Sequence, residues 1–454
     1  MGIEPRRQLV VQALRRAAEA ADAARQLARL RVSLALEVDD VRLELSSAGP
    51  RVSVAAPLAL WDLCLGASPP PGCQSIGALT RSRADFRLVG EPLAVAQCLG
   101  VLEAMVETAR GQLAAATGAS ARDAATPEAE PGQASAATAV APARSESLAG
   151  ISGRYLPLEL PGLGRLWVYE ESAGAASRPP MLLLHTAGAD SRQWHGLMTD
   201  ERLNARWRML AFDMPFHGRS NPPLDWNGEP WRLDTARYVA TLDAYLDAAG
   251  IARALIVGCS MGAAAGLAYI AARPERALGA ILLEAPFRSP GRRSPFLDHP
   301  AVHAGRVSAA WVQALLAPSS PSGRRRRATW IYGQGGPGVY EGDLAFYSDD
   351  FDAADHVARV DTRRTPLWLL TGEYDYSAAP ADSRRIADAI PGARFEAMPG
   401  LGHFPMVENP DLLMTWLLPA ATAIAAAAAR SLVDADHPIP DADHSITTPP
   451  QEAT

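Results

Sequence analysis

From residue 151 onward, short runs of apolar residues alternate with longer segments in which apolar residues recur at helical spacing. This alternation indicates a mostly parallel β-sheet, because neighbouring parallel strands need a crossover helix between them. Buried strands are predicted at Met181–Leu184, Met209–Phe212, Leu255–Val257, Ala280–Leu283, Leu367–Leu370 and Phe395–Met398. Two further runs, Leu156–Leu160 and Leu166–Glu170, predict an antiparallel hairpin ahead of them. The predicted fold class of this part is therefore α/β.

A long insertion interrupts this pattern after Glu284. About 80 residues separate it from the next predicted strand, which is far longer than an ordinary connection. The insertion is rich in proline, glycine, arginine and aromatic residues, so we expect a separate cap at about residues 287–365. Its aromatic residues are expected to enclose an apolar or aromatic substrate or to form the core of the cap: Trp311, Trp330, Tyr332, Tyr340, Phe346 and Tyr347. The run Arg324–Arg327 could attract an anionic substrate such as an acyl-coenzyme A, but it is more typical of a solvated loop.

Composition divides the rest of the chain. Residues 1–111 combine helical spacing with alternating strand patterns, which predicts a small α+β domain. Residues 112–150 are mostly small or polar and cannot bury enough apolar surface to offset the entropy of ordering, so they predict a disordered linker. A second domain is predicted over residues 151–430, followed by a disordered tail at residues 431–454.

The charged residues exclude several functions. The net charge is −7, and the 43 basic residues are all arginines, so the chain offers no lysine for a Schiff base or a P-loop. A mildly acidic chain without a basic half argues against nucleic-acid binding.

The four cysteines show no metal-binding spacing, and no other motif suggests a metal or cofactor. No apolar run approaches the ~20 residues of a membrane helix, and no secretory signal is evident, so a cytoplasmic protein is expected.

The segment Gly258-Cys259-Ser260-Met261-Gly262 lies between the predicted strand Ala254–Val257 and a predicted helix over 263–272. A sharp strand-to-helix turn leaves little space on either side of the serine, and glycine fits there. The turn exposes the serine hydroxyl at the start of a helix, which is typical of a catalytic nucleophile. The alternative is an ordinary serine that caps the helix. The motif therefore predicts Ser260 as the nucleophile.

A serine nucleophile needs a base to remove its proton and a carboxylate to orient that base. Asp375 follows the strand Leu367–Leu370, and His403 follows the strand Phe395–Met398. The order Ser, Asp, His along the chain, each in a loop after a strand, resembles the α/β-hydrolase family over about residues 151–423. The resemblance implies a catalytic triad of Ser260, His403 and Asp375. Some relatives supply the acid from an earlier strand, which leaves Glu284 as an alternative.

The resemblance also implies an oxyanion hole made of two backbone amides. One belongs to Met261, the residue after the nucleophile. The other belongs to the loop after the first central strand, where the family usually has H-G-x-x and this chain has His185-Thr186-Ala187-Gly188. The second donor then falls on Ala187. Thr186 departs from the family pattern, and His185 is expected to be a buried structural residue.

These residues predict a serine hydrolase that cleaves a carboxylic ester or related acyl compound, in the carboxylesterase class (EC 3.1.1). Similar triads also serve carbon–carbon bond hydrolases, thioesterases, lactonases and cofactor-free haloperoxidase-like enzymes, which remain alternatives. The expected partner is a small apolar or aromatic substrate, and homo-oligomerisation is left open.

A weaker resemblance concerns the first domain. The segment Phe86–Pro92 reads as a strand that runs through a Gly-Glu turn into a closing helix. This resembles the sterol-carrier-protein type of lipid-binding domain over about residues 32–110. The resemblance implies that the first domain binds or delivers an apolar substrate, and a lipid-binding protein without catalysis is the non-enzymatic alternative. A packing or dimerisation domain is an equally good interpretation.

Overall fold

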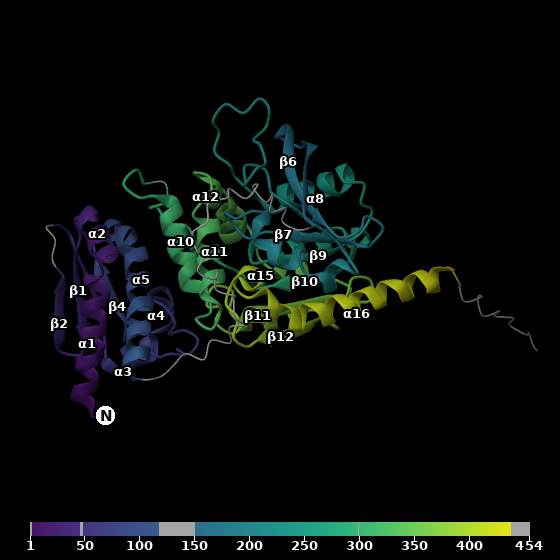
Figure 1. Ribbon diagram of the computed structural model, residues 1–454. Coiled ribbons are helices and arrows are strands. Elements are labelled where there is room, and N and C mark those ends of the chain that lie inside the picture. Colours follow the sequence, from purple (N-terminus) through teal and green to yellow (C-terminus); the bar gives the residue numbers. More distant parts are fainter. Residues whose placement is uncertain (1, 46–48, 118–149, 298, 437–454) are drawn as a thin grey trace, which may run out of the picture.

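The computed structural model describes residues 2–45, 49–117, 150–297 and 299–436. Figure 1 shows two folded units with the helical insertion between them. The first unit is the predicted α+β domain, but its last helix, α5 (Pro92–Thr117), continues six residues into the segment predicted as a linker. Leu113 of that extension is buried. The remainder of the predicted linker lies outside the described residues.

The first unit has a four-stranded sheet in the order β2-β1-β3-β4. Strands β1 (Ser33–Val38) and β3 (Arg51–Ala56) are parallel neighbours, while β2 (Val41–Leu45) and β4 (Arg87–Gly90) add antiparallel edges. The helices are α1 (Ile3–Glu19), α2 (Ala21–Leu30), α3 (Leu58–Leu65), α4 (Ile76–Ser82) and α5. Strand β4 leads through Glu91 into α5, as predicted, but the sterol-carrier-protein resemblance stays a prediction.

The second unit contains an eight-stranded sheet in the order β12-β11-β10-β9-β7-β8-β6-β5. Its strands are β5 (Ser152–Leu160), β6 (Gly164–Ala173), β7 (Pro180–Leu184), β8 (Arg208–Phe212), β9 (Ala254–Cys259), β10 (Ala277–Leu283), β11 (Leu367–Gly372) and β12 (Arg394–Met398). The strands from β7 to β12 are parallel, and β5 and β6 form the antiparallel hairpin. The predicted fold class is confirmed, and a strand lies at each of the eight predicted positions. The prediction that Phe395–Met398 is buried was wrong, because β12 is an edge strand whose residues are mostly exposed.

Helices cover both faces of this sheet. Helix α9 (Met261–Ala272) has the sequence MGAAAGLAYIAA and is buried almost all round, because its small side chains let it lie directly on β9 and β10. The other helices outside the insertion are α6 (His195–Met198), α7 (Glu201–Asn204), α8 (Thr235–Ala248), α14 (Pro380–Ala389), α15 (Pro405–Glu408) and α16 (Pro410–Asp436), with short 3₁₀ turns at Ser191–Trp194 and Pro274–Arg276. Helix α16 includes the first six residues of the predicted tail, 431–436, and the rest of the predicted tail lies outside the described residues.

The insertion between β10 and β11 is helical, as expected for a cap. It contains α10 (Ala304–Leu315), α11 (Ser322–Tyr332), α12 (Val339–Leu344), a π-helical turn at Ala345–Asp350 and α13 (Ala354–Val357). Helix α10 packs against α4 and α5 of the first unit and against α11 (Figure 1). Arg324–Arg327 therefore lie on a helix rather than in the predicted loop. The cap is covered by the first unit on one side and by the sheet on the other.

Two helices are long and apolar enough to cross a membrane by length and composition alone. These are α5 and the Pro410–Ala428 part of α16, with 44% and 33% of the most apolar window buried within the protein. Helix α5 packs against α1, α2 and α10, and α16 packs against β10 and α15. Core helices of folded domains pass the same test, so these two give no clear membrane span.

Candidate active site

The turn between β9 and α9 holds Ser260 in a conformation that few non-glycine residues adopt, with φ 54° and ψ −113°. A Cβ at Gly258 would lie 2.1 Å from the carbonyl oxygen of Gly262, and one at Gly262 would lie 2.3 Å from that of Leu184. Both positions therefore exclude any side chain. The glycines of the motif are required by close backbone approach, and together they fix the serine at the start of α9.

The structure brings together the three residues predicted as a triad. The Oγ of Ser260 lies 2.9 Å from Nε2 of His403, and Nδ1 of His403 lies 2.6 Å from Oδ2 of Asp375. The three side chains are nearly buried, with exposed fractions of 3–4%. They follow β9, β12 and β11, whose C-terminal ends meet at one edge of the sheet. The result is one continuous hydrogen-bonded chain from hydroxyl to imidazole to carboxylate.

Asp375 is held in its ionised form. Its Oδ1 accepts hydrogen bonds from the backbone amides of Ser377 at 2.7 Å and Ala378 at 3.1 Å. Burial raises the pKa of Asp375, but the attraction of His403 and these hydrogen bonds outweigh it and hold the pKa below its ordinary value. A carboxylate of this kind can orient the imidazole and stabilise its positive charge.

Glu284, the alternative acid, lies next to Asp375 and has no hydrogen bond to His403. Both of its carboxyl oxygens lie 3.0 Å from the amide nitrogen of Gly372. Burial, followed by the charge of Asp375, raises the pKa of Glu284 well above its ordinary value. The protonated Glu284 is therefore a hydrogen-bond donor to Asp375 and not a second orienting carboxylate.

The acidic pair and the histidine also meet a simple distance criterion for metal binding. One ligand atom from each of Glu284, Asp375 and His403 lies within 4.8 Å of the others. Hydrogen bonds already account for the short distances between these groups, because Asp375 is hydrogen-bonded both to His403 and to Glu284. We therefore interpret the cluster as a hydrogen-bonded group of side chains rather than as a metal site.

The two amides predicted for the oxyanion hole lie beside Ser260. Met261 is the first residue of α9, where a helix leaves its amides without intrahelical acceptors. Ala187 lines the same cavity as Ser260. In residues 150–297 and 299–436, neither amide has a hydrogen-bond acceptor. Thr186, where the family usually has glycine, bonds through its hydroxyl to Tyr332 of the cap and to Gln193.

The neighbouring histidines have structural partners. The Nε2 of His185 accepts the amide of Met214 at 3.0 Å, in agreement with the structural role predicted for it. His217 pairs with Asp343 of α12 at 2.8 Å. Asp343 also accepts the amide of Gly188, next to Ala187, at 2.8 Å. The cap is thereby tied to the loop that carries the predicted oxyanion donor.

Tyr347 contacts the nucleophile in a way that the sequence did not predict. Its hydroxyl lies 3.1 Å from Oγ of Ser260 and comes from the π-helical turn of the cap. Burial raises the pKa of Tyr347, so it stays a neutral hydrogen-bonding group. The sequence indicated only that this residue was one of several cap aromatics, because nothing local places a cap residue against the nucleophile.

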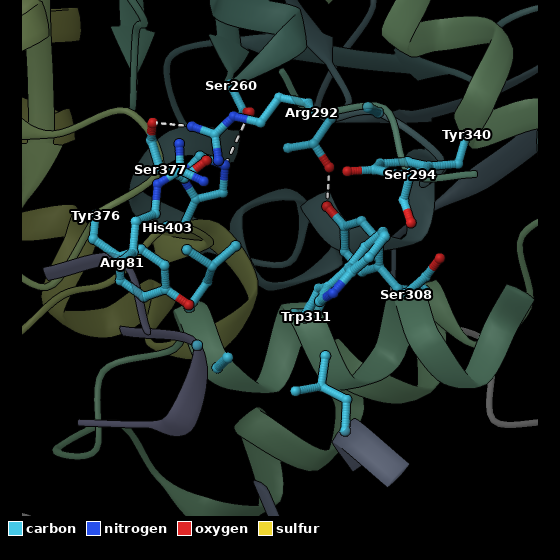
Figure 2. A pocket seen from close by; sticks show the side chains of 18 of the residues that line it. Arg81, Ser260, Arg292, Ser294, Ser308, Trp311, Tyr340, Tyr376, Ser377 and His403 are labelled. Carbon is cyan, nitrogen blue, oxygen red and sulfur yellow. Dashed lines mark hydrogen bonds between the residues drawn. The ribbon is translucent and has the colours of Figure 1, made fainter. Parts of the chain in front are cut away.

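A cavity opens onto Ser260 and His403 (Figure 2). Its volume of about 490 Å³ lies in the range of small-molecule sites. Four of the six predicted cap aromatics line it: Trp311, Tyr332, Tyr340 and Tyr347. Phe346 packs in the core against Tyr238 and Phe351, and Trp330 is exposed beside Arg192. Arg324–Arg327 do not line it, and Arg325 pairs instead with Glu107 of α5 at 2.5 Å.

Glu408 on α15 holds the loop that carries His403. Its Oε1 accepts the amides of Gly402 and Phe404, both at 3.1 Å. Its Oε2 accepts the amide of Ala317 and the hydroxyl of Ser320, both at 2.8 Å. Burial raises the pKa of Glu408 to about 7, while these four donors favour the ionised form. This buried carboxylate joins the histidine loop to the cap, and no sequence pattern predicted its role.

Replacing Glu408 by glutamine should misplace His403, because the amide NH₂ would face two of the four donors. We expect about 2 kcal/mol less unfolding free energy, since buried donors are left without acceptors, and a kcat about tenfold lower. Urea unfolding and ester hydrolysis measure the two effects. Glu396→Gln, on the exposed side of β12, is the matched control. Equal effects of the two substitutions would contradict the role given to Glu408.

Comparison with known proteins places the second unit in a family. Residues 181–416 match the model of the alpha/beta hydrolase family. A Mycobacterium tuberculosis protein named "Putative non-heme bromoperoxidase BpoC" is 25% identical over 254 residues, covering 53% of this chain and 92% of that protein. An uncharacterized carboxylesterase of Bacillus subtilis is 24% identical over 252 residues, covering 53% of this chain and 78% of that protein.

A solved structure agrees with this fold. A crystal structure described as "a putative aryl esterase from Burkholderia cenocepacia" superimposes with a TM-score of 0.51 at 18% identity, covering 60% of this chain and all of that one. At that identity the likeness concerns the fold alone. The matched family model spans the nucleophile turn and both loops that complete the hydrogen-bonded chain. The chain therefore belongs to the alpha/beta hydrolase family.

Proposed function

We propose that this protein is a serine hydrolase that cleaves a carboxylic ester through an acyl-enzyme. The observation that carries the proposal is the hydrogen-bonded chain Ser260–His403–Asp375, which opens onto a cavity of small-molecule size. A protein that only binds lipid has no need of such a chain. The similarity to a carboxylesterase of Bacillus subtilis supports the same class of reaction.

In the proposed mechanism, Oγ of Ser260 attacks the ester carbonyl while Nε2 of His403 takes its proton. Asp375 keeps the imidazole in the tautomer that can accept that proton, and stabilises the imidazolium. The amides of Met261 and Ala187 donate to the oxyanion of the tetrahedral intermediate. His403 then protonates the leaving alcohol. Water, activated by His403, releases the acid and restores Ser260.

A second candidate is haloperoxidase-like activity, because a relative is named as a non-heme bromoperoxidase. Thioesterase, lactonase and carbon–carbon hydrolase activities use the same nucleophile and also remain candidates. The shape of the cavity decides among them, and four aromatic side chains of the cap contribute to its wall.

The test combines a labelled probe with a substrate panel. A fluorophosphonate is expected to label the full chain, with the modified peptide containing Ser260, and Ser260→Ala should not be labelled. The panel holds an ester, a thioester, a lactone, a vinylogous diketone, and peroxide with bromide. We expect the ester to be cleaved with the highest kcat/KM. Equal labelling of the alanine variant, or no turnover of any acyl substrate, would overturn the proposal.

A further inference from the structure

The first unit supplies one wall of the cavity that contains Ser260. Residues of α4, β4 and α5 line it opposite the nucleophile, among them Arg81, Leu88, Val95 and Leu99. This wall was absent from the sequence prediction, which gave the first domain a site of its own or none. The cavity is therefore completed only when both units are in contact.

Hydrogen bonds fix the first unit beside the loop of Asp375. Gln74 donates to the carbonyl of Tyr374 at 2.9 Å, and the hydroxyl of Tyr374 donates to the carbonyl of Pro69 at 2.9 Å. Ser75 donates to the carbonyl of Ala314 in the cap at 2.9 Å. A Cβ at Gly77 would lie 2.7 Å from the hydroxyl of Tyr376, so the two units are in tight contact there.

Two arginines face the cavity from opposite sides. Arg81 lies near the end of α4, and Arg292 lies in the segment after β10. In Figure 2 their side chains converge on the space beside Ser260 and His403. Burial lowers the pKa of Arg81, and the nearby charge of Arg292 lowers it further. Arg81 is exposed at the mouth of the cavity and Arg292 is half-buried, so water screens part of their repulsion. An anion bound between the two like charges would relieve the rest.

Neither guanidinium is neutralised by the protein. Arg292 donates to the backbone carbonyl of Ser377, and its Nε is buried without a hydrogen-bond partner. Neither Arg81 nor Arg292 forms an ion pair with any carboxylate in the part of the chain that the structure describes. By contrast, the next residue, Arg293, pairs with both Glu341 and Asp349.

Two carboxyl groups near this space already have other partners. Asp375 is bonded to His403 and to two backbone amides. Glu103 of α5 accepts the amides of Ile76 at 3.2 Å and Gly77 at 2.9 Å, and burial raises its pKa to about 7. Asp375 attracts Arg81, and Asp382 attracts Arg292, without forming an ion pair with either. Among the described residues, the cavity beside Ser260 therefore holds two arginines that have no ion-pair partner.

Part of the remaining wall is apolar. Its large apolar residues are Leu88, Val95 and Leu99 of the first unit and Trp311, Val312 and Leu315 of α10, and side chains with hydroxyl groups line the cavity between them and the arginines. Arginine forks bind oxyanions through paired hydrogen bonds, whereas an aliphatic or aromatic chain gains free energy when it leaves water for such a surface. The cavity thus combines a site for an anion with a site for an apolar chain.

We propose that the substrate is amphipathic, with an oxyanion bound between Arg81 and Arg292 and an apolar chain lying between α10 and the first unit. Carboxylate and phosphate groups share this chemistry. The interpretation of this anion site as a substrate site rests on the proposed hydrolase function. It gives the first unit a role in substrate selection through a residue of its own, Arg81.

Kinetics on matched substrates test the inference. One pair is mono(p-nitrophenyl) adipate and p-nitrophenyl hexanoate, and a second pair is 4-hexanoyloxybenzoate and phenyl hexanoate, which moves the charge to the leaving group. In at least one pair we expect kcat/KM to favour the anion by about tenfold or more, mostly through a lower KM. Arg81→Met and Arg292→Met should each reduce that ratio by about fivefold or more.

The matched control is Arg87→Met, which removes the same charge from an exposed position on β4 outside the cavity. In Arg87→Met, the ratio of kcat/KM for the anionic substrate to kcat/KM for the neutral one should equal that of the wild type. A ratio near one for both pairs in the wild type would overturn the inference. So would an unchanged ratio in both Arg81→Met and Arg292→Met.

Binding to the full-length Ser260→Ala protein provides a readout that needs no turnover. Calorimetry with octanoate, octyl phosphate and octanol should show at least one anion binding about tenfold more tightly than the alcohol, with the difference reduced in Arg81→Met. Equal binding of all three would overturn the inference. Anion binding without ester turnover or Ser260 labelling would refute the hydrolase and keep the anion site. Labelling of Ser260 and ester turnover without a preference for the anion would keep the hydrolase function and refute the anion site.

Discussion

Replacing Ser260 by alanine is expected to lower kcat for ester hydrolysis by about 10⁴-fold or more, because the covalent step loses its nucleophile. The residual rate would come from binding and from the amides of Met261 and Ala187, which the substitution leaves in place. Hydrolysis of a p-nitrophenyl ester, measured at high enzyme concentration, gives the ratio. The fold should persist, because the turn is fixed by Gly258 and Gly262 rather than by the serine hydroxyl.

Tyr347→Phe is the comparison for this substitution. It removes the hydroxyl that lies 3.1 Å from Oγ of Ser260 but leaves the bond to His403. We expect a loss of about tenfold at most, the effect of one hydrogen bond. A kcat for Ser260→Ala that stays within tenfold of the wild type would contradict the role of Ser260.

The sequence predicted this part of the site because the information is local. Ser260, Asp375 and His403 each come shortly after a strand of the sheet, and the C-terminal ends of parallel strands meet at one edge. Sites in open α/β sheets form at that edge. A short motif after each strand was therefore enough to place three residues that are far apart in the chain.

The residues that sequence reasoning missed depend on contacts between distant segments. Arg81 reaches the cavity only because α4 packs on α10, and Glu408 acts through donors from a cap segment 91 residues earlier. No periodicity or motif marks either residue. Tyr347 depends on the path of the cap, which has no regular pattern to read.

The domain boundary was misplaced for a different reason. Half of residues 112–117 are alanine, and composition grouped this stretch with the linker. Alanine is also the best helix former, and Leu113 continues the buried stripe of α5. A helix that is already packed can extend through such residues at little cost. Composition alone does not separate the two cases.

Asp375→Asn is expected to lower kcat by about 10⁴-fold, while Glu284→Gln should lower it by about tenfold at most. The asparagine NH₂ would face Nδ1 of His403 in one of its two orientations and would favour the tautomer that cannot accept the proton of Ser260. Glutamine at 284 stays neutral, as the protonated Glu284 is, and its NH₂ can still donate to Asp375. The measurement is the dependence of kcat on pH for the wild type and both variants.

The two variants also separate the two acids. The raised pKa of Glu284 means that it carries no charge for His403 to use, so its loss should leave the shape of the pH profile unchanged. If Glu284 were the orienting acid, Glu284→Gln would cost as much as Asp375→Asn, and Asp375→Asn would retain a fraction of the activity. The 2.6 Å contact between Asp375 and His403 favours the first outcome, because orientation of the imidazole depends on the carboxylate that touches it.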